Sequence, residues 1–301
     1  MSEGLLQQNL SEVGEFQQHY MMYLLFEEAP ELPSADAVKE ALLKRFPDGV
    51  DIAESVENCS SFKLSGHIVE DEEGAVETAQ LLLGTPTAFD GSEVDALARS
   101  QQWECPESEK LFAKAKYKLL FSDHTASDLP YPERCELLTL WSETIVELFP
   151  GCTGVWFAAS GKLLTPTQIK ENSYEDGERF LLGGLNIRYF AVDSTRDYLV
   201  DTVGLYAIGL PDVQYFFNTL DPDDVVNHAF SVAAYQFNED APIEDGETVD
   251  GFSAKNPEKG NNPEIQWTCK YGESLLQPKR DVLSVEPGRF AAGAGKKKGK
   301  R

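Results

Sequence analysis

Apolar residues in the first third of the chain fall into short runs of strand length, with one amphipathic segment between them. The run Tyr20–Phe26 predicts a strand. Helical spacing of the apolar residues after Ser34 predicts a helix with Ser34 as its N-cap, ending at Pro47-Asp48-Gly49. Two further runs, Ser61–Val69 and Thr78–Leu83, predict strands joined by an acidic turn. The chain therefore begins with a β-α-β-β pattern.

The middle of the chain carries the widest amphipathic stripe. A short helix is expected near Glu93–Ser100 and a strand over Ala115–Phe121. A strand over Thr153–Ala159 and a short helix over Leu164–Asn172 are expected after the stripe. The stripe itself predicts a long helix with Asp128 as its N-cap, and its apolar face comprises Leu137, Leu138, Trp141, Ile145, Leu148 and Phe149.

The last third repeats the alternation of strands and single helices. Strands are predicted over Asn186–Val192, Tyr198–Ile208 and Val213–Phe217, with the turn Gly209-Leu210-Pro211 between the last two. Glycine at 204 allows a bulge or a close backbone approach, and Gly209 can supply a positive φ. These glycines are explained by structure, with a binding surface as the open alternative.

A second strongly signalled helix follows this pair of strands. Asp221 is its predicted N-cap, Pro222 fits the first turn, and the next two aspartates complement the helix dipole. The segment Asn238–Pro263 is acidic and rich in glycine and proline, which predicts a long loop. Two final strands, Ile265–Tyr271 and Asp281–Val285, are expected to close the folded part.

Strand pairs set between single helices favour an α+β fold with mainly antiparallel sheets and helices packed on one face. The pattern predicts two β-α-β-β-like halves. The expected organisation is a loose N-terminal leader over residues 1–18, an N-terminal half over 19–174, a C-terminal half over 175–288 and a disordered basic tail over 289–301.

Charge is the strongest compositional signal. The chain has 26 Lys and Arg residues against 51 Asp and Glu residues, a net charge of −25, with the acidic residues spread along it. This field repels nucleic acid and anionic membranes and favours a basic partner. No apolar run reaches the roughly 20 residues of a membrane helix, and five cysteines without a close pair predict reduced, mostly buried thiols. A soluble cytoplasmic protein is therefore expected.

The end of the chain is the one basic exception to the acidic composition. The stretch from Arg289 onward reads RFAAGAGKKKGKR and holds six basic residues and no acidic one. Such a tail can contact nucleic acid weakly through phosphate charge, or dock onto an acidic surface, including that of this protein. A solubilising or weakly docking tail is the favoured interpretation. A lone phenylalanine does not support base stacking. The candidate contact residues of the tail are Lys296, Lys297, Lys298, Lys300 and Arg301.

Several segments resemble one bacterial protein family. The strand Asn186–Val192 followed by DTVGLYAIGLPDVQ, the element Asp245–Gly251 and the upstream TGVWFAASGKLLTP are together similar to the domain of unknown function DUF4261, over about residues 153–285. Val203 departs from the polar or basic residue expected there, which puts any binding role of that position in doubt. The resemblance implies bacterial kin and no particular activity.

Candidate chemistry is sparse. His19, His67, His124 and His228 show no metal-ligand spacing, and no nucleotide-binding or nucleophile motif occurs, so no cofactor or metal is predicted. His124, between Asp123 and Asp128 in an expected strand-to-helix loop, is the best catalytic candidate, although a solvated histidine is the more usual outcome. His228, inside an apolar helix, is interpreted as a hydrogen-bonded and partly buried residue.

Two other functional hypotheses follow. The acidic loop over residues 239–247 can in principle bind calcium, but it lacks the EF-hand ligand order, and a solvated loop is the simpler interpretation. The favoured hypothesis is a cytoplasmic protein-interaction, regulatory or immunity-like module that acts through its acidic surface. The alternative is an enzyme of unrecognised type with a cleft between the two halves, with His124 or the loop after Asn238 near it.

Overall fold

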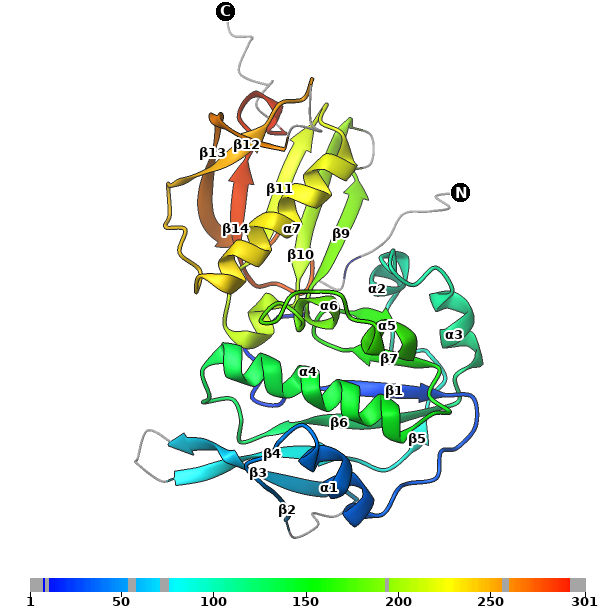
Figure 1. The fold of residues 1–301 in the computed structure, drawn as a ribbon. Helices are drawn as coiled ribbons and strands as arrows, with labels where there is room; N and C mark the ends of the chain where they lie inside the picture. Colours follow the sequence, from blue (N-terminus) through cyan, green and yellow to red (C-terminus); the bar gives the residue numbers. More distant parts are fainter. Residues whose placement is uncertain are drawn as a thin grey trace, which may run out of the picture. The chain divides into compact units, whose positions relative to one another are not determined.

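A computed structural model of the chain describes residues 8, 11–53, 58–70, 76–192, 195–255 and 260–292. The chain divides into two compact units, each with its own sheet (Figure 1). The N-terminal unit is Gln17–Gly184, and the C-terminal unit combines Met1–Phe16 with Leu185–Arg301. The sequence placed the division at 174/175 and treated residues 1–18 as a separate leader.

The described end of that leader is tied to the C-terminal unit. The Gly14 N–H donates to the Lys279 carbonyl at 2.8 Å, and the Lys279 N–H donates to the Glu12 carbonyl at 2.9 Å. Val13 forms a parallel bridge with the same lysine. Residues 12–14 of the leader thus lie along a loop that is far away in the sequence.

The N-terminal unit is built on an antiparallel sheet. Its strand order is β2-β3-β4-β6-β1-β7-β8, and β5 pairs with β6. Every pairing in it is antiparallel. The strands are β1 (Met22–Phe26), β2 (Val50–Ile52), β3 (Ser60–Glu70), β4 (Val76–Leu83), β5 (Thr87–Ala88), β6 (Tyr117–His124), β7 (Gly154–Phe157) and β8 (Lys162–Leu164).

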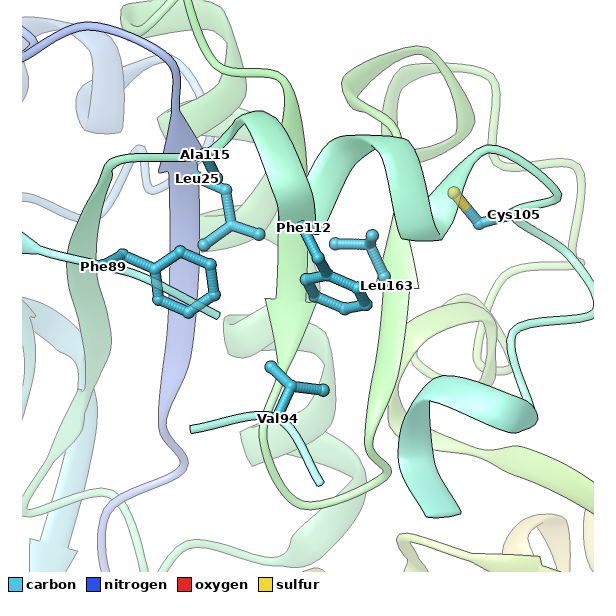
Figure 2. Close-up of a cluster of buried hydrophobic side chains, with 7 residues drawn as sticks. All are labelled: Leu25, Phe89, Val94, Cys105, Phe112, Ala115 and Leu163. Atoms are coloured by element: carbon cyan, nitrogen blue, oxygen red, sulfur yellow. The ribbon is translucent and has the colours of Figure 1, made fainter. Parts of the chain in front are cut away.

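Helices cover both faces of this sheet, whereas the sequence predicted helices on one face. The side chains of a strand alternate between faces, and the apolar strand β1 is buried on both of them. On one face, Met22 of β1 contacts Ser142 of α4, and the Phe26 ring packs against Phe149 at 5.9 Å. On the other face, Leu25 packs in a buried cluster with Phe112 of α3 (Figure 2). The helices are α1 (Ala35–Leu43), α2 (Ala96–Ser100), α3 (Ser108–Lys114), α4 (Tyr131–Leu148), α5 (Pro166–Lys170) and α6 (Leu181–Gly184).

The C-terminal unit is a six-stranded sheet with one long helix, α7 (Pro222–Asn238), against one face (Figure 1). The strand order is β12-β13-β14-β11-β10-β9, and among the described strands of this sheet only the β11–β14 pairing is parallel. The strands are β9 (Asn186–Ala191), β10 (Asp197–Val203), β11 (Asp212–Asn218), β12 (Thr248–Phe252), β13 (Asn261–Glu273) and β14 (Asp281–Glu286). Short 3-10 turns are η1 (Leu205–Ile208) and η3 (Gly288–Phe290).

The α+β class, the dominance of antiparallel pairing and two of the three predicted helix caps are confirmed. Ser34 accepts from the Ala37 N–H at the start of α1, and Asp221 accepts from the Asp223 N–H at the start of α7. The predicted thiols are confirmed too, since all five cysteines are free and four are buried. Among the described residues no helix is long and apolar enough to cross a bilayer.

Three local predictions are wrong. Helix α4 begins after Pro130 without a side-chain cap, so Asp128 does not cap it. The strand expected over Tyr198–Ile208 stops at Val203, because Gly204 turns the backbone at φ 130° into η1. The expected loop Asn238–Pro263 contains β12 and the start of β13, an edge hairpin whose sparse apolar residues hide its pattern.

Glycine explains why that hairpin was missed. A Cβ added at Gly251 of β12 meets the Trp267 ring at 2.5 Å, so the tryptophan packs directly on a bare backbone. Glycine in a strand interior lowers the sequence signal for a strand. The helix expected over Leu164–Asn172 is also shorter than predicted, since β8 takes Leu164 and α5 begins at Pro166 behind a capping box from Thr165.

The Figure 2 cluster makes a stability prediction. Replacing Phe112 by Ala removes a fully buried ring and is expected to lower the free energy of unfolding by about 3–5 kcal/mol. Ile68→Ala, at a side chain that is 55% exposed in the same unit, is the control and should cost far less. Urea unfolding followed by circular dichroism measures both. Equal losses would contradict the assignment of this cluster as core.

Candidate functional site

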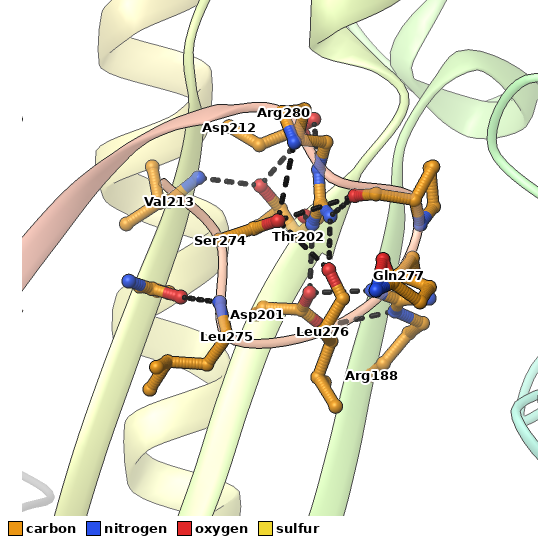
Figure 3. A network of polar contacts seen from close by, with 12 residues as sticks. Arg188, Asp201, Thr202, Asp212, Val213, Ser274, Leu275, Leu276, Gln277 and Arg280 are labelled. Carbon is orange, nitrogen blue, oxygen red and sulfur yellow. Dashed lines mark hydrogen bonds and ion pairs between the residues drawn. The ribbon is translucent and has the colours of Figure 1, made fainter. Parts of the chain in front are cut away.

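Four charged side chains meet inside the C-terminal unit, on the face of the sheet opposite α7. They are Arg188 of β9, Asp201 of β10, Asp212 of β11 and Arg280, which immediately precedes β14; we call them the buried charge network (Figure 3). Tyr215 points at α7, so strand alternation sends Gln214 and Asp212 to the other face. Arg188 and Asp201 are register partners there.

The network alternates positive and negative groups. Arg188 donates from Nε to Asp201 Oδ1 at 2.9 Å and from a terminal nitrogen to Oδ2 at 2.5 Å, a bidentate pair. Arg280 then donates to the same Oδ2 at 2.7 Å and to Asp212 Oδ2 at 2.9 Å. Each inner member therefore touches two groups of opposite charge, and the four charges cancel.

Asp212 also organises the turn that follows β10. Its carboxylate accepts from the Thr202 hydroxyl at 3.0 Å and from the N–H groups of Gly204 and Leu205, both at 3.3 Å. Gly209 closes the 3-10 turn in the left-handed region at φ 87°, which confirms the positive φ expected of it. The glycines thus shape a turn whose free N–H groups are satisfied by a buried carboxylate.

A loop just before β14 covers the network. Arg280 donates to the carbonyls of Leu276 and Pro278, and Arg188 donates to the Gln277 carbonyl at 2.8 Å. Gln277 is 2% exposed, yet neither atom of its side-chain amide has a hydrogen-bond partner within the described residues. The arginines hold this loop through its backbone carbonyls, while the glutamine amide remains unused.

Electrostatics keep the network ionised. Burial alone would lower the pKa of Arg280, but the Asp212 and Asp201 carboxylates beside it raise that pKa above its ordinary value. Burial raises the pKa of Asp212, and the Arg280 guanidinium and the Thr202 hydroxyl oppose this shift. We assign Asp212 as a carboxylate, because a permanently charged guanidinium and several N–H donors face it.

The structure places His124 at the end of β6 instead of in a loop. Its ring stacks on His19 with centroids 5.0 Å apart, and its Nδ1 is buried without a partner in the described chain. Asp123 is turned away, because its carboxylate accepts from Arg134 and from the Tyr20 N–H, both at 2.6 Å. The expected His124–Asp123 combination therefore does not form.

Backbone strain follows this histidine directly. Thr125 has φ 56°, a conformation that is unfavourable for a β-branched residue, and its hydroxyl donates to the Thr78 carbonyl at 3.0 Å. Such strain costs on the order of 1–3 kcal/mol and is found most often at functional or tightly determined positions. The Asp123 carboxylate is bound elsewhere, so it does not reach the stacked imidazoles of His19 and His124.

His228 matches its interpretation as a hydrogen-bonded residue. Its Nδ1 lies 2.7 Å from the Tyr215 hydroxyl, and its Nε2 lies 2.7 Å from the Asp250 carbonyl. Since a carbonyl only accepts, Nε2 carries a proton and Nδ1 of the neutral ring accepts from the tyrosine. Burial lowers the pKa of His228, so the ring is held neutral.

The acidic loop uses part of its carboxylates to accept from backbone N–H groups, one in the loop itself and one in β13. Glu247 accepts from the Glu244 N–H at 2.8 Å, and Asp245 accepts from the Tyr271 N–H at 2.8 Å. Across the described ranges, no group of three or more His, Cys, Asp or Glu side chains is arranged to hold a metal ion. The tail residues Lys296, Lys297, Lys298, Lys300 and Arg301 lie outside the described residues.

Comparison with known proteins identifies the region around the network. Residues 201–286 match the family model of the domain of unknown function DUF4261. The resemblance to DUF4261 is confirmed for this part of the chain, which holds Asp201, Asp212 and Arg280, while Arg188 precedes it. No curated protein and no solved structure matches the chain.

The network was not recognised in the sequence, although a signal for it exists. Asp201 stands inside the apolar run YLVDTV, and Arg188 interrupts the strand NIRYFA. A charge in an apolar strand is buried only if it is paired. This pattern predicts that Asp201 and Arg188 are buried and paired. Asp212 and Arg280 lie beside turns, where charged residues are common, so their positions give no such signal.

Removing one arginine tests the network. Arg280→Met keeps most of the side-chain volume but leaves Asp201 and Asp212 without their shared cation, and we expect a loss of about 3–5 kcal/mol in the free energy of unfolding. Lys270→Met is the control, because Lys270 pairs with Glu286 at the surface and should cost less than about 1 kcal/mol. Chemical denaturation measures both, and equal losses would refute the proposed dependence on Arg280.

The pH dependence of stability tests His228. Because its folded pKa lies below the ordinary value of 6.5, the unfolded chain binds the proton first as the pH falls. The contribution of neutral His228 to the free energy of unfolding is complete above pH 6.5. It is lost as the pH falls below 6.5, with a slope of at most about 1.4 kcal/mol per pH unit. Chemical denaturation of the wild type and of His228→Gln from pH 8 to pH 5 isolates the pH dependence that His228 contributes, since Gln does not titrate. Parallel curves would contradict it.

Proposed function

We propose that this protein is an interaction module of regulatory or immunity-like type, which binds a basic partner through its acidic surface. The observation that carries the proposal is the way charge divides between interior and surface. Among the described residues, the buried acidic side chains are Asp123, Asp201 and Asp212, and the buried basic ones are Arg134, Lys162, Arg188 and Arg280.

This division leaves the acidic excess of the chain outside the buried set. The chain has 26 basic and 51 acidic residues, so the residues other than those seven number 22 basic and 48 acidic. The three buried acids are paired with arginine, and none of the acidic excess is buried among the described residues. Such a surface accelerates encounter with a positively charged protein and disfavours nucleic acid and anionic membranes.

Two further features support the proposal. The part of the chain similar to DUF4261 commits Asp201, Asp212 and Arg280 to a buried ionic cluster. Five free thiols suit a reducing compartment, and we propose the cytoplasm as the site of action. The alternative of an enzyme that uses His124 stays a prediction from the sequence.

Partner capture tests the function. The chain is immobilised and exposed to extract of its native host at low salt, beside a resin that carries polyglutamate of equal charge. We expect a basic protein that the chain retains and the polyglutamate does not, with retention falling steeply as salt rises because the attraction is screened over a Debye length of about 10 Å at 0.1 M. Identical proteins on both resins would refute a specific partner.

A further inference from the structure

A row of aromatic rings crosses the C-terminal sheet beside the first turn of α7. Tyr189 of β9 lies 5.7 Å from Tyr198 of β10, which lies 5.8 Å from Phe217 of β11. All three face α7, as Tyr215 does. Tyr189 shares the register position of Tyr215, and the pair Tyr198 and Phe217 lies two residues away from it, so all of these side chains are on one face of the sheet. Both tyrosines are partly exposed, so their rings border solvent at this end of the sheet.

Carboxylates adjoin this row. Asp221 and Asp223, the N-cap and first-turn residues of α7, are exposed. Residues 218–220 join Phe217, at the end of the row, to Asp221, so α7 begins at this end of the sheet. Partial burial raises the pKa of Tyr189, and Tyr198, Asp223 and Asp221 add to this shift. We call Tyr189, Tyr198, Asp221 and Asp223 the tyrosine patch. Ring faces with nearby carboxylates attract ammonium and guanidinium groups. The two carboxylates together carry more negative charge than the roughly half positive charge at the N-terminus of a helix, so the net local charge is negative.

The described chain ends beside this patch. Ala291 forms an antiparallel bridge with Phe217, and the Ala292 N–H donates to the Phe216 carbonyl at 3.0 Å. Tyr198 is also a register partner of Phe217, so Ala291 and Tyr198 flank β11 on opposite sides. Two interstrand spacings separate them, about 10 Å. The basic tail therefore starts within reach of the patch.

We propose that the basic tail of this chain, Lys296 to Arg301, binds the tyrosine patch of its own molecule and competes there with an external basic partner. Charge is complementary, since the tail carries five basic residues over these positions and the patch two carboxylates. Reach is sufficient, because a chain spans at most about 3.6 Å per residue, about 14 Å from Ala292 to Lys296 and about 32 Å to Arg301. Only the competition rests on the proposed function; the docking does not.

A short tether makes the contact effective. Linking a weak ligand to its site gives an effective concentration on the order of millimolar, so even a millimolar contact is largely formed within the molecule. The tail would then act as a built-in competitor, which only a partner with stronger complementarity displaces. Nonspecific basic proteins are kept from the patch by the same means.

A peptide added in trans tests the docking. A fluorescent peptide with the sequence of residues 289–301 is titrated, with anisotropy as the readout, into the full chain and into a chain that ends at Ala292. We expect binding to the shortened chain at low salt and at least about tenfold weaker binding to the full chain, whose own tail occupies the patch. Equal affinities, or no binding to the shortened chain, would overturn the proposal.

Charge variants locate the site. In the shortened chain, Asp221→Asn with Asp223→Asn removes two charges while keeping an N-cap side chain, and should weaken peptide binding about tenfold. Glu239→Gln with Asp240→Asn removes two exposed charges at the other end of α7 and should change it less than about twofold. Equal weakening would mean a diffuse acidic surface. No external partner is present, so this test and partner capture can fail separately.

Discussion

The alternating pairing of Arg188, Asp201, Arg280 and Asp212 is the constraint on which the C-terminal unit depends. A charge transferred from water to a protein interior is costly unless it is paired and hydrogen-bonded, and each of these groups is both. The network joins strands β9, β10 and β11 to the segment before β14, so that distant parts of the sequence are fixed in one register. It also ends β10, since Asp212 binds the N–H groups of the turn after it.

The N-terminal unit uses a smaller version of the same device. Asp123 at the end of β6 is buried against Arg134 of α4, and its second oxygen accepts from the backbone of Tyr20 just before β1. An aspartate at a strand end thus receives donors from a helix and from a neighbouring strand. In both units an acid inside the fold is committed to architecture, which removes it from the candidates for chemistry.

This commitment shapes the functional interpretation. Because the few buried acids are paired with arginine, the net negative charge of the chain comes from the residues outside this buried set, which number 48 acidic and 22 basic. Local features then decide at which part of the surface a basic segment is bound specifically. The partly exposed tyrosines beside the start of α7 combine ring faces with two carboxylates, and the described chain ends next to them. Charge attracts a basic segment, and rings with fixed geometry give it a position.

Sequence alone determined the class of fold, the main helices and the family resemblance. The period of the apolar residues and the caps Ser34 and Asp221 each depend on residues of one element. Such local signals can be recognised in the sequence without the tertiary structure. The net charge and the free thiols likewise follow from composition. The resemblance to DUF4261 rests on a contiguous segment, which is why it too could be found without coordinates.

Only the tertiary structure decided which charges are buried, where β10 stops and what His124 touches. Arg188 and Arg280 lie far apart in the chain, and no local pattern shows that they share Asp201. The edge hairpin β12–β13 was hidden because Gly251 yields its side-chain space to Trp267 across the pair. His124 was paired with Asp123 by adjacency, yet neighbours in a strand point to opposite faces. Contacts between distant residues fix these features, and a sequence carries no direct record of such contacts.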